Sequence, residues 1–138
     1  IVGLGEACRL RAEEMVVDEV EIGKKRDHLQ ALLQAQIPDI VINGDLQNRL
    51  AGNLHVSIPG IPNSAIIARV RHQLAISTGS ACSSGVEASS HVLRSMNLSE
   101  PLVEGSLRIG LGKFTTDSDI TQAAEHISNA ILAISRLL

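Results

Sequence analysis

The spacing of apolar side chains predicts a long helix at each end of the chain. Residues 1 to about 35 place apolar side chains on one helical stripe, at Ala12, Met15, Ile22, Leu29 and Leu33. Pro38 ends this first helix. A second stripe begins after a helix cap at Thr116 or Asp117 and predicts a helix that runs to the C-terminus. Its inward positions are Ile120, Ala124, Ile127, Ile131, Ile134 and Leu138.

Between these helices, alternating apolar and polar residues predict short strands. The predicted strands are 54–58, 74–77 and 107–111. The predicted short helices are 63–71, capped by Asn63, and 91–96. A short β-branched run at 40–42 leads into an Asn-Gly-Asp turn. We therefore expect an α+β fold in which helices cover a small, three-stranded, mainly antiparallel sheet.

Composition and charge narrow the class of protein. The 138 residues fit a single domain, and with one Phe and no Trp or Tyr the core must be aliphatic. The net charge of −3 and the lack of aromatic stacking residues argue against nucleic acid as a partner. No apolar run approaches the roughly 18 residues that span a bilayer, so we expect no membrane partner. The opening IVGLG resembles the middle of a packed segment, which favours a piece of a longer protein.

The two cysteines are Cys8 and Cys82. Two cysteines do not make a disulfide framework, so a reducing, cytoplasmic setting is expected. No CxxC motif is present, and the five histidines lack metal-ligand spacing, so no metal site is predicted. Cys8 lies among apolar residues of the first predicted helix, and we expect it to be a small buried hydrophobic residue.

Cys82 is the best candidate for chemistry. It lies within residues 78–90, a loop of almost entirely small residues, so its thiol should be exposed. An exposed thiol in a reducing compartment is a liability unless the protein uses it. The alternative is a flexible Ser/Gly linker that happens to hold a cysteine.

Arg108 is the second candidate. It alternates with Leu107 and Ile109, so it points away from the apolar face of its predicted strand. Ser106 and Gly110 leave space beside it, and a guanidinium held on a strand can bind a carboxylate through two hydrogen bonds. The alternative is an ordinary surface arginine.

Four segments together are similar to the NifS/IscS-type cysteine desulfurases, in the branch with a long mobile cysteine loop. These segments are STGSACSS (77–84), NLHVS (53–57), HVLRSM (91–96) and SLRIGLGKFTT (106–116). The resemblance covers nearly the whole chain but only the C-terminal third or so of a family member. The joint pattern is specific, whereas any one segment alone is not.

The resemblance implies the small domain of a fold-type I, pyridoxal-phosphate-dependent, homodimeric enzyme. Residues 1–35 would form the connecting helix from the large domain, and 40–138 the small domain that carries the loop 78–90. The family converts L-cysteine to L-alanine. By position, Cys82 would carry the sulfur as a persulfide for an iron–sulfur scaffold or another acceptor protein. Arg108 would hold the substrate carboxylate.

The resemblance also implies what this chain lacks. The family's cofactor-binding lysine, its stacking histidine and its phosphate-binding groups belong to the large domain, and Lys24, Lys25 and Lys113 match no lysine motif of the family. We therefore expect this chain alone to bind no pyridoxal phosphate and to be inactive. Two alternatives remain: a stand-alone module that accepts sulfur on Cys82 from another protein, and the small domain of another fold-type I enzyme in which Cys82 is incidental.

Overall fold

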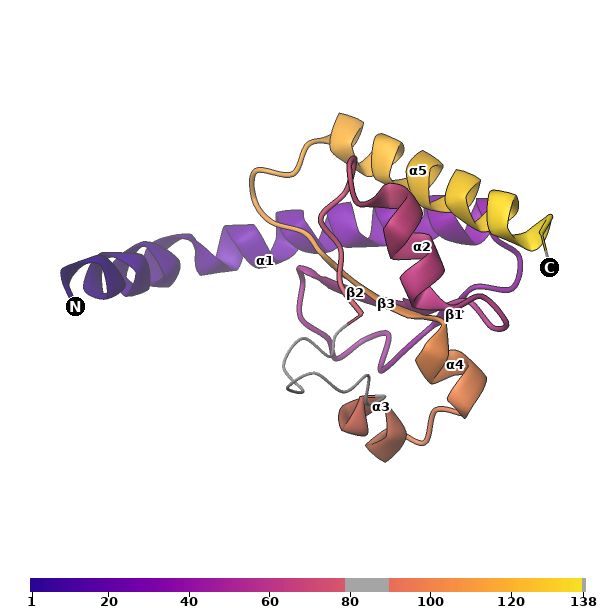
Figure 1. Cartoon of the computed structure of the whole chain (residues 1–138). Helices are drawn as coiled ribbons and strands as arrows, with labels where there is room; N and C mark the ends of the chain where they lie inside the picture. Colours follow the sequence, from indigo (N-terminus) through magenta and orange to yellow (C-terminus); the bar gives the residue numbers. More distant parts are fainter. Residues whose placement is uncertain (79–89, 138) are drawn as a thin grey trace.

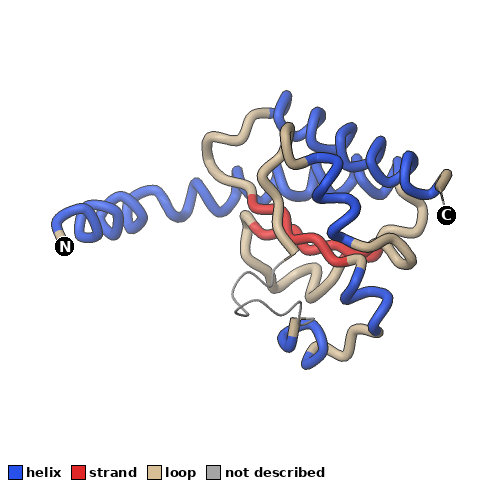
Figure 2. Tube along the Cα trace, in the orientation of Figure 1, coloured by secondary structure: helices blue, strands red, loops and turns tan. Residues whose placement is uncertain are grey.

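The computed structural model describes residues 1–78 and 90–137. Its elements are α1 (Val2–Gln36), β1 (Val41–Ile42), β2 (Asn53–Ser57), α2 (Asn63–Val70), α3 (His91–Ser95), α4 (Glu100–Glu104), β3 (Ser106–Gly110) and α5 (Asp117–Ser135). Helices α1 and α5 lie side by side on one face of the sheet, and α2 packs beside α5 (Figures 1 and 2). The short helices α3 and α4 lie on the opposite side. None of the described helices is long and apolar enough to cross a bilayer.

The sheet is antiparallel throughout, with the strand order β1-β2-β3. Leu54 pairs with Ile109 and Val56 with Leu107, and these four side chains are buried beneath the helices. The alternate positions, which include His55 and Arg108, face the other way. The α+β class and the small antiparallel sheet are thus confirmed.

One of the three predicted strands, 74–77, was wrong. Residues 74–77 do not form a strand, because the residues that leave α2 first make a tight turn in which the Gln73 and Leu74 amides donate to the Val70 carbonyl. Only Ser77 reaches the sheet, as a single bridge to Arg108. The third strand is instead β1, which pairs with β2.

The core is aliphatic, as the composition predicted. It joins the sheet to α1, α2 and α5 through residues such as Leu33, Leu54, Ile66 and Ile127, each without exposed surface. The α5 stripe is confirmed from Ile120 to Ile134, and Leu138, the last position predicted for it, lies outside the described residues. Burying each Leu or Ile side chain of this core contributes roughly 1.5–3 kcal/mol relative to leaving it in water.

The apolar stripe of α1 is confirmed only in its second half. Leu29 and Leu33 are buried, but Ala12 and Met15 are exposed. A helix of 35 residues is about 52 Å long, which is longer than the sheet and α5 that it packs on. Its first half therefore projects away from the described body (Figure 1). Cys8 lies on this part, so the expectation that it is buried was wrong.

Of the two predicted helix N-caps, one was correct and one was wrong. Thr116 caps α5 in a capping box with Asp119, as expected. Asn63 does not cap α2, since its Nδ2 donates to the Ser106 carbonyl 3.1 Å away and Pro62 occupies the cap position. This bond instead links the start of α2 to β3.

Helix α4 was not predicted, and it leads directly into β3. Gly105 joins the two, and a Cβ atom there would lie 2.1 Å from the Ile58 carbonyl oxygen. The Ile58 amide also donates to the Gly105 carbonyl at 3.0 Å. Only glycine permits this approach, which sets where β3 begins and hence where Arg108 lies.

Candidate functional site

Arg108 occupies the middle of β3 on the polar face of the sheet. Its neighbours Leu107 and Ile109 are 0% and 5% exposed, whereas Arg108 itself is exposed. The strand and the face predicted for this residue are therefore confirmed. Its role as a carboxylate-binding residue remains a prediction.

The main chain of Arg108 is hydrogen-bonded to Ser77, the last residue before the segment that contains Cys82. The Arg108 amide donates to the Ser77 carbonyl at 2.7 Å, and the Ser77 amide donates to the Arg108 carbonyl at 3.3 Å. Residues 78–90, which contain Cys82, follow directly in the chain. Cys82 itself lies outside the described residues.

These two bonds also determine how Arg108 meets its partner on β2. Because the Arg108 amide and carbonyl both point toward Ser77, His55 and Arg108 form a non-hydrogen-bonded pair in the β2–β3 register. Side chains approach most closely in pairs of this type, whose Cβ atoms are typically about 4.5–5.5 Å apart. The imidazole and the guanidinium are therefore neighbours on one face.

A hydrogen-bond network fixes the His55 ring. The Ser57 hydroxyl donates to the Leu102 carbonyl at 2.7 Å, which uses its single proton. Asn43 Nδ2 must then donate to Ser57 Oγ, 2.7 Å away, and its second proton faces His55 Nδ1 at 2.9 Å. Nδ1 is thus the acceptor, and the network assigns the ring proton to Nε2.

The surroundings keep His55 uncharged. Burial of the half-buried ring, and secondarily the positive charge of Arg108, lower the pKa of His55 below its usual 6.5. Protonation at Nδ1 would also set an N–H group against the Asn43 amide. At neutral pH, His55 therefore places a neutral N–H donor beside a cation.

Sequence reasoning did not identify His55 or Asn43. His55 does occupy a polar position of an alternating strand, as Arg108 does. An antiparallel alignment of these two strands would have shown that the residues share a face. The hydrogen bonds of Asn43 depend on β1, which was not predicted to be part of the sheet.

The three lysines do not form a cofactor site. Lys24 pairs with Glu21 on α1, Lys113 pairs with Glu14, and Lys25 donates to the Lys113 carbonyl. The bond to Glu14 raises the pKa of Lys113, which keeps it an ammonium. A lysine that binds pyridoxal phosphate reacts as a free amine, so the described residues do not fit this cofactor. Within 1–78 and 90–137, no group of His, Cys, Asp or Glu side chains is arranged to hold a metal ion.

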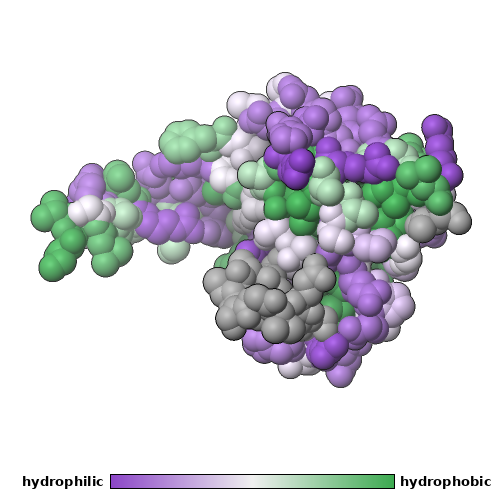
Figure 3. All heavy atoms as spheres, viewed as in Figure 1, coloured by the Kyte–Doolittle hydropathy of each residue, from purple (hydrophilic) through white to green (hydrophobic). Residues whose placement is uncertain are grey.

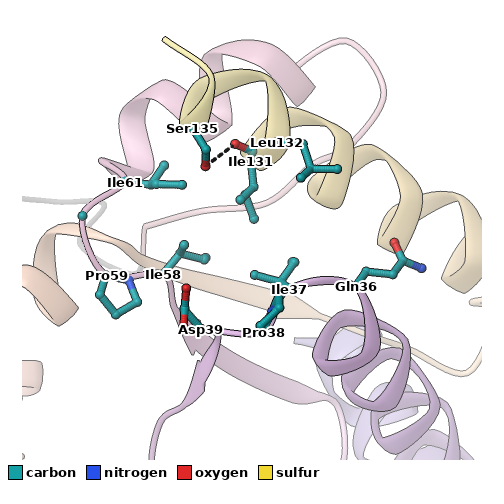
Figure 4. Close-up of a pocket in the computed structure, with 11 residues that line it drawn as sticks. Gln36, Ile37, Pro38, Asp39, Ile58, Pro59, Ile61, Ile131, Leu132 and Ser135 are labelled. Carbon is teal, nitrogen blue, oxygen red and sulfur yellow. Dashed lines mark hydrogen bonds between the residues drawn. The ribbon is translucent and has the colours of Figure 1, made fainter. Parts of the chain in front are cut away.

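A hollow of about 310 Å³ lies elsewhere, where α1 and α5 end (Figure 4). It is lined mainly by apolar side chains, including Ile37, Ile58 and Ile131. The hydroxyl of Ser135 donates to the Ile131 carbonyl at 3.0 Å. None of the residues of the Arg108 face lines this hollow.

Two relatives with similar sequences carry the same description. The chain is 42% identical over 130 residues to the cysteine desulfurase IscS of Ehrlichia chaffeensis, which covers 94% of this chain and 32% of that protein. The IscS of Colwellia psychrerythraea is 41% identical over 131 residues, with 95% and 32% covered. The chain is homologous to one third of an IscS-type cysteine desulfurase. The resemblance to the NifS/IscS-type enzymes is thereby confirmed.

Solved structures agree with this homology. A NifS-like protein from Rickettsia africae superposes with a TM-score of 0.80 at 26% identity, covering 94% of this chain and 33% of that one. A second NifS-like protein has a TM-score of 0.81 at 24% identity, which supports the fold alone. No protein-family model matches the chain. The chain spans about a third of the length of its IscS relatives.

Proposed function

We propose that this chain is the C-terminal small domain of a cysteine desulfurase and supplies two groups to the reaction, the Cys82 thiol and the Arg108 guanidinium. The observation that carries the proposal is the pairing of Arg108 with Ser77. It joins an exposed arginine on a strand to the starting point of the cysteine loop. The IscS relatives, at 41–42% identity, support the same reaction.

In this reaction Cys82 accepts sulfur from L-cysteine. Its thiolate attacks the substrate sulfur, so an S–S bond forms on Cys82 while the C–S bond of the substrate breaks. The carbon gains a proton, and L-alanine leaves. Cys82 follows Ser77 by five residues, which limits the separation of their Cα atoms to about 18 Å. That reach includes the substrate beside Arg108 and permits transfer to an iron–sulfur scaffold or another acceptor.

Arg108 binds the substrate carboxylate. Strands β2 and β3 and the Ser77 bridge hold its backbone, so the guanidinium starts from a fixed position. A guanidinium can grip a carboxylate through two parallel charge-assisted hydrogen bonds. The substrate would thus be oriented by the same strand that anchors the cysteine loop.

The pyridoxal phosphate chemistry comes from outside these 138 residues, because the lysines of this chain do not fit the cofactor. We propose that residues 1–35 connect to the part that binds it, as in a dimeric full-length enzyme. The exposed apolar side chains at the start of α1 support this proposal (Figure 3), among them Val2 (89% exposed) and Leu4 (71% exposed). Such side chains are suited to packing against further protein.

A stand-alone sulfur-accepting module is the second candidate. It needs no cofactor lysine, so the lysines of this chain are compatible with it as well as with the first candidate. Such a module would take sulfur on Cys82 from the persulfide of another protein and would not act on L-cysteine. A reducing cytoplasm, in which the thiol stays available, remains the expected location for both candidates.

The test uses a complete, pyridoxal-phosphate-loaded enzyme that contains this chain. Cys82→Ala should abolish L-alanine formation from L-cysteine while the absorbance of the bound cofactor is unchanged. Cys8→Ala is the matched control and should retain full turnover, because Cys8 lies on the projecting first half of α1, away from Arg108. Arg108→Ala should raise the KM for L-cysteine by the equivalent of about 2–4 kcal/mol.

Two results would contradict the proposal. Turnover retained in Cys82→Ala would remove the thiol from its role, and an unchanged KM in Arg108→Ala would make the arginine a surface residue. Persulfide that reaches Cys82 only from a second protein, never from L-cysteine, would favour the stand-alone module.

A further inference from the structure

The polar face of β2 and β3 holds a second ordered hydrogen-bond donor beside Arg108. We propose that His55 binds the carboxylate of the amino-acid substrate together with Arg108, donating its Nε2–H to one carboxylate oxygen. This inference rests on the proposed function, in which Arg108 binds that carboxylate. It adds a substrate-binding residue from a different strand.

The sheet register places the two side chains together. His55 and Arg108 are direct partners in the β2–β3 pairing, and both face away from the aliphatic core. Since Arg108 directs its main-chain bonds to Ser77, the pair is of the close, non-hydrogen-bonded type. A ligand bound by the guanidinium therefore lies within reach of the imidazole.

The network beneath the ring decides which atom His55 offers to a ligand. The Leu102 carbonyl, Ser57 and Asn43 are linked in sequence, and the last link occupies Nδ1. The ring can then present only Nε2, and it presents this atom as a donor. A donor next to a guanidinium complements an acceptor that carries negative charge, which is what a carboxylate provides.

The uncharged state of His55 suits this role. A carboxylate has two oxygens with about four acceptor positions, and the guanidinium fork uses two of them. A neutral N–H can fill a further position without adding a second cation beside Arg108. His55 thus adds a hydrogen bond and orientation, while Arg108 supplies the charge.

The experiment compares two substitutions that each keep one half of the ring's function. In His55→Asn, the amide oxygen can still accept from Asn43, but nothing reaches the position of Nε2. In His55→Gln, the amide nitrogen reaches the position of Nε2 and can donate there. Both variants are made in the complete, cofactor-loaded enzyme, and the inhibition constants of L-alanine and of ethylamine, which lacks the carboxylate, are measured against L-cysteine.

We expect His55→Asn to raise the inhibition constant of L-alanine about tenfold to hundredfold, which is the range for losing a hydrogen bond to a charged group. The KM for L-cysteine should rise in parallel. The inhibition constant of ethylamine should not change, because it has no carboxylate for His55 to bind. His55→Gln should bind L-alanine within about threefold of wild type.

Wild-type affinity for L-alanine in His55→Asn, or equal losses in both variants, would overturn the inference. Arg108→Ala separates this outcome from failure of the proposed function. If that variant raises the inhibition constant of L-alanine while His55→Asn does not, only the role of His55 fails. If Arg108→Ala leaves L-alanine binding unchanged, the carboxylate site itself is wrong.

Discussion

His55 and Arg108 are 53 positions apart in the sequence, and an antiparallel register makes them neighbours. Each has a main-chain reason for its position, since Arg108 is bonded to Ser77 while the Asn43 amide donates to the His55 carbonyl at 2.9 Å. Their chemistry is complementary, because one is a permanent cation and the other is held neutral. The electrostatic character of the site therefore depends on His55 staying unprotonated.

This dependence predicts a pH effect on stability. The native state holds the pKa of His55 below 6.5, so just below pH 6.5 the unfolded chain binds more protons than the folded chain. The stability that neutral His55 provides is present above pH 6.5 and is lost as the pH falls through the native pKa. We therefore expect the free energy of unfolding, measured in urea at pH 7.5 and pH 5.5, to fall more on acidification in wild type than in His55→Asn. Equal losses in the two proteins would contradict this prediction.

At the scale of single elements, α1 has two physically different halves. Its second half contributes Leu29 and Leu33 to the core, whereas Val16 and Val17 in its first half are 74% and 67% exposed. Ion pairs within the helix line the exposed half, such as those of Arg9 with Glu6 and Glu13. Pairs of this kind support a helix only weakly, by about 0.2–0.5 kcal/mol each.

Matched substitutions in the two halves should differ sharply in their effect on stability. Leu33→Ala should lower the free energy of unfolding by about 2–5 kcal/mol, because it leaves a cavity in the core. Val16→Ala, on the same helix, should change it by no more than about 0.5 kcal/mol. Denaturant unfolding of the 138-residue chain measures both. A large loss in Val16→Ala would show that the first half of α1 is packed in the isolated chain.

At the scale of the molecule, the two faces of the sheet differ in composition, one being aliphatic and the other polar. The face beneath α1, α2 and α5 is aliphatic and holds the fold together. The opposite face carries the polar residues of β2 and β3, with α4 contacting it near Ser57 through the Leu102 carbonyl. All three lysines lie on α1 or in the loop after β3, where their partners are surface groups.

This distribution predicts that the isolated chain does not bind pyridoxal phosphate in a specific way. Titrating the cofactor into the 138-residue chain should produce no saturable visible absorbance beyond that of an unstructured lysine peptide. A saturable band that disappears in one Lys→Ala variant would contradict the prediction, because it would identify a cofactor lysine within this chain.

The sequence alone determined the features that depend on local periodicity and local motifs. The alternation around Arg108 set its face, and the stripe of α5 set its buried side. Four segments taken together, among them those around Cys82 and Arg108, indicated the resemblance to the enzyme family. Helix α4, which has five residues and Pro101 near its start, was not predicted from the sequence.

Only the tertiary structure decided the features that depend on contacts between distant residues. It made β1 rather than 74–77 the third strand, left Cys8 exposed, and placed His55 beside Arg108 with Asn43 bonded to its ring. The physical reason is that the spacing of apolar residues indicates which face of a helix or strand can be buried. Strand register and the length of the neighbouring elements decide what buries it and which polar side chains meet.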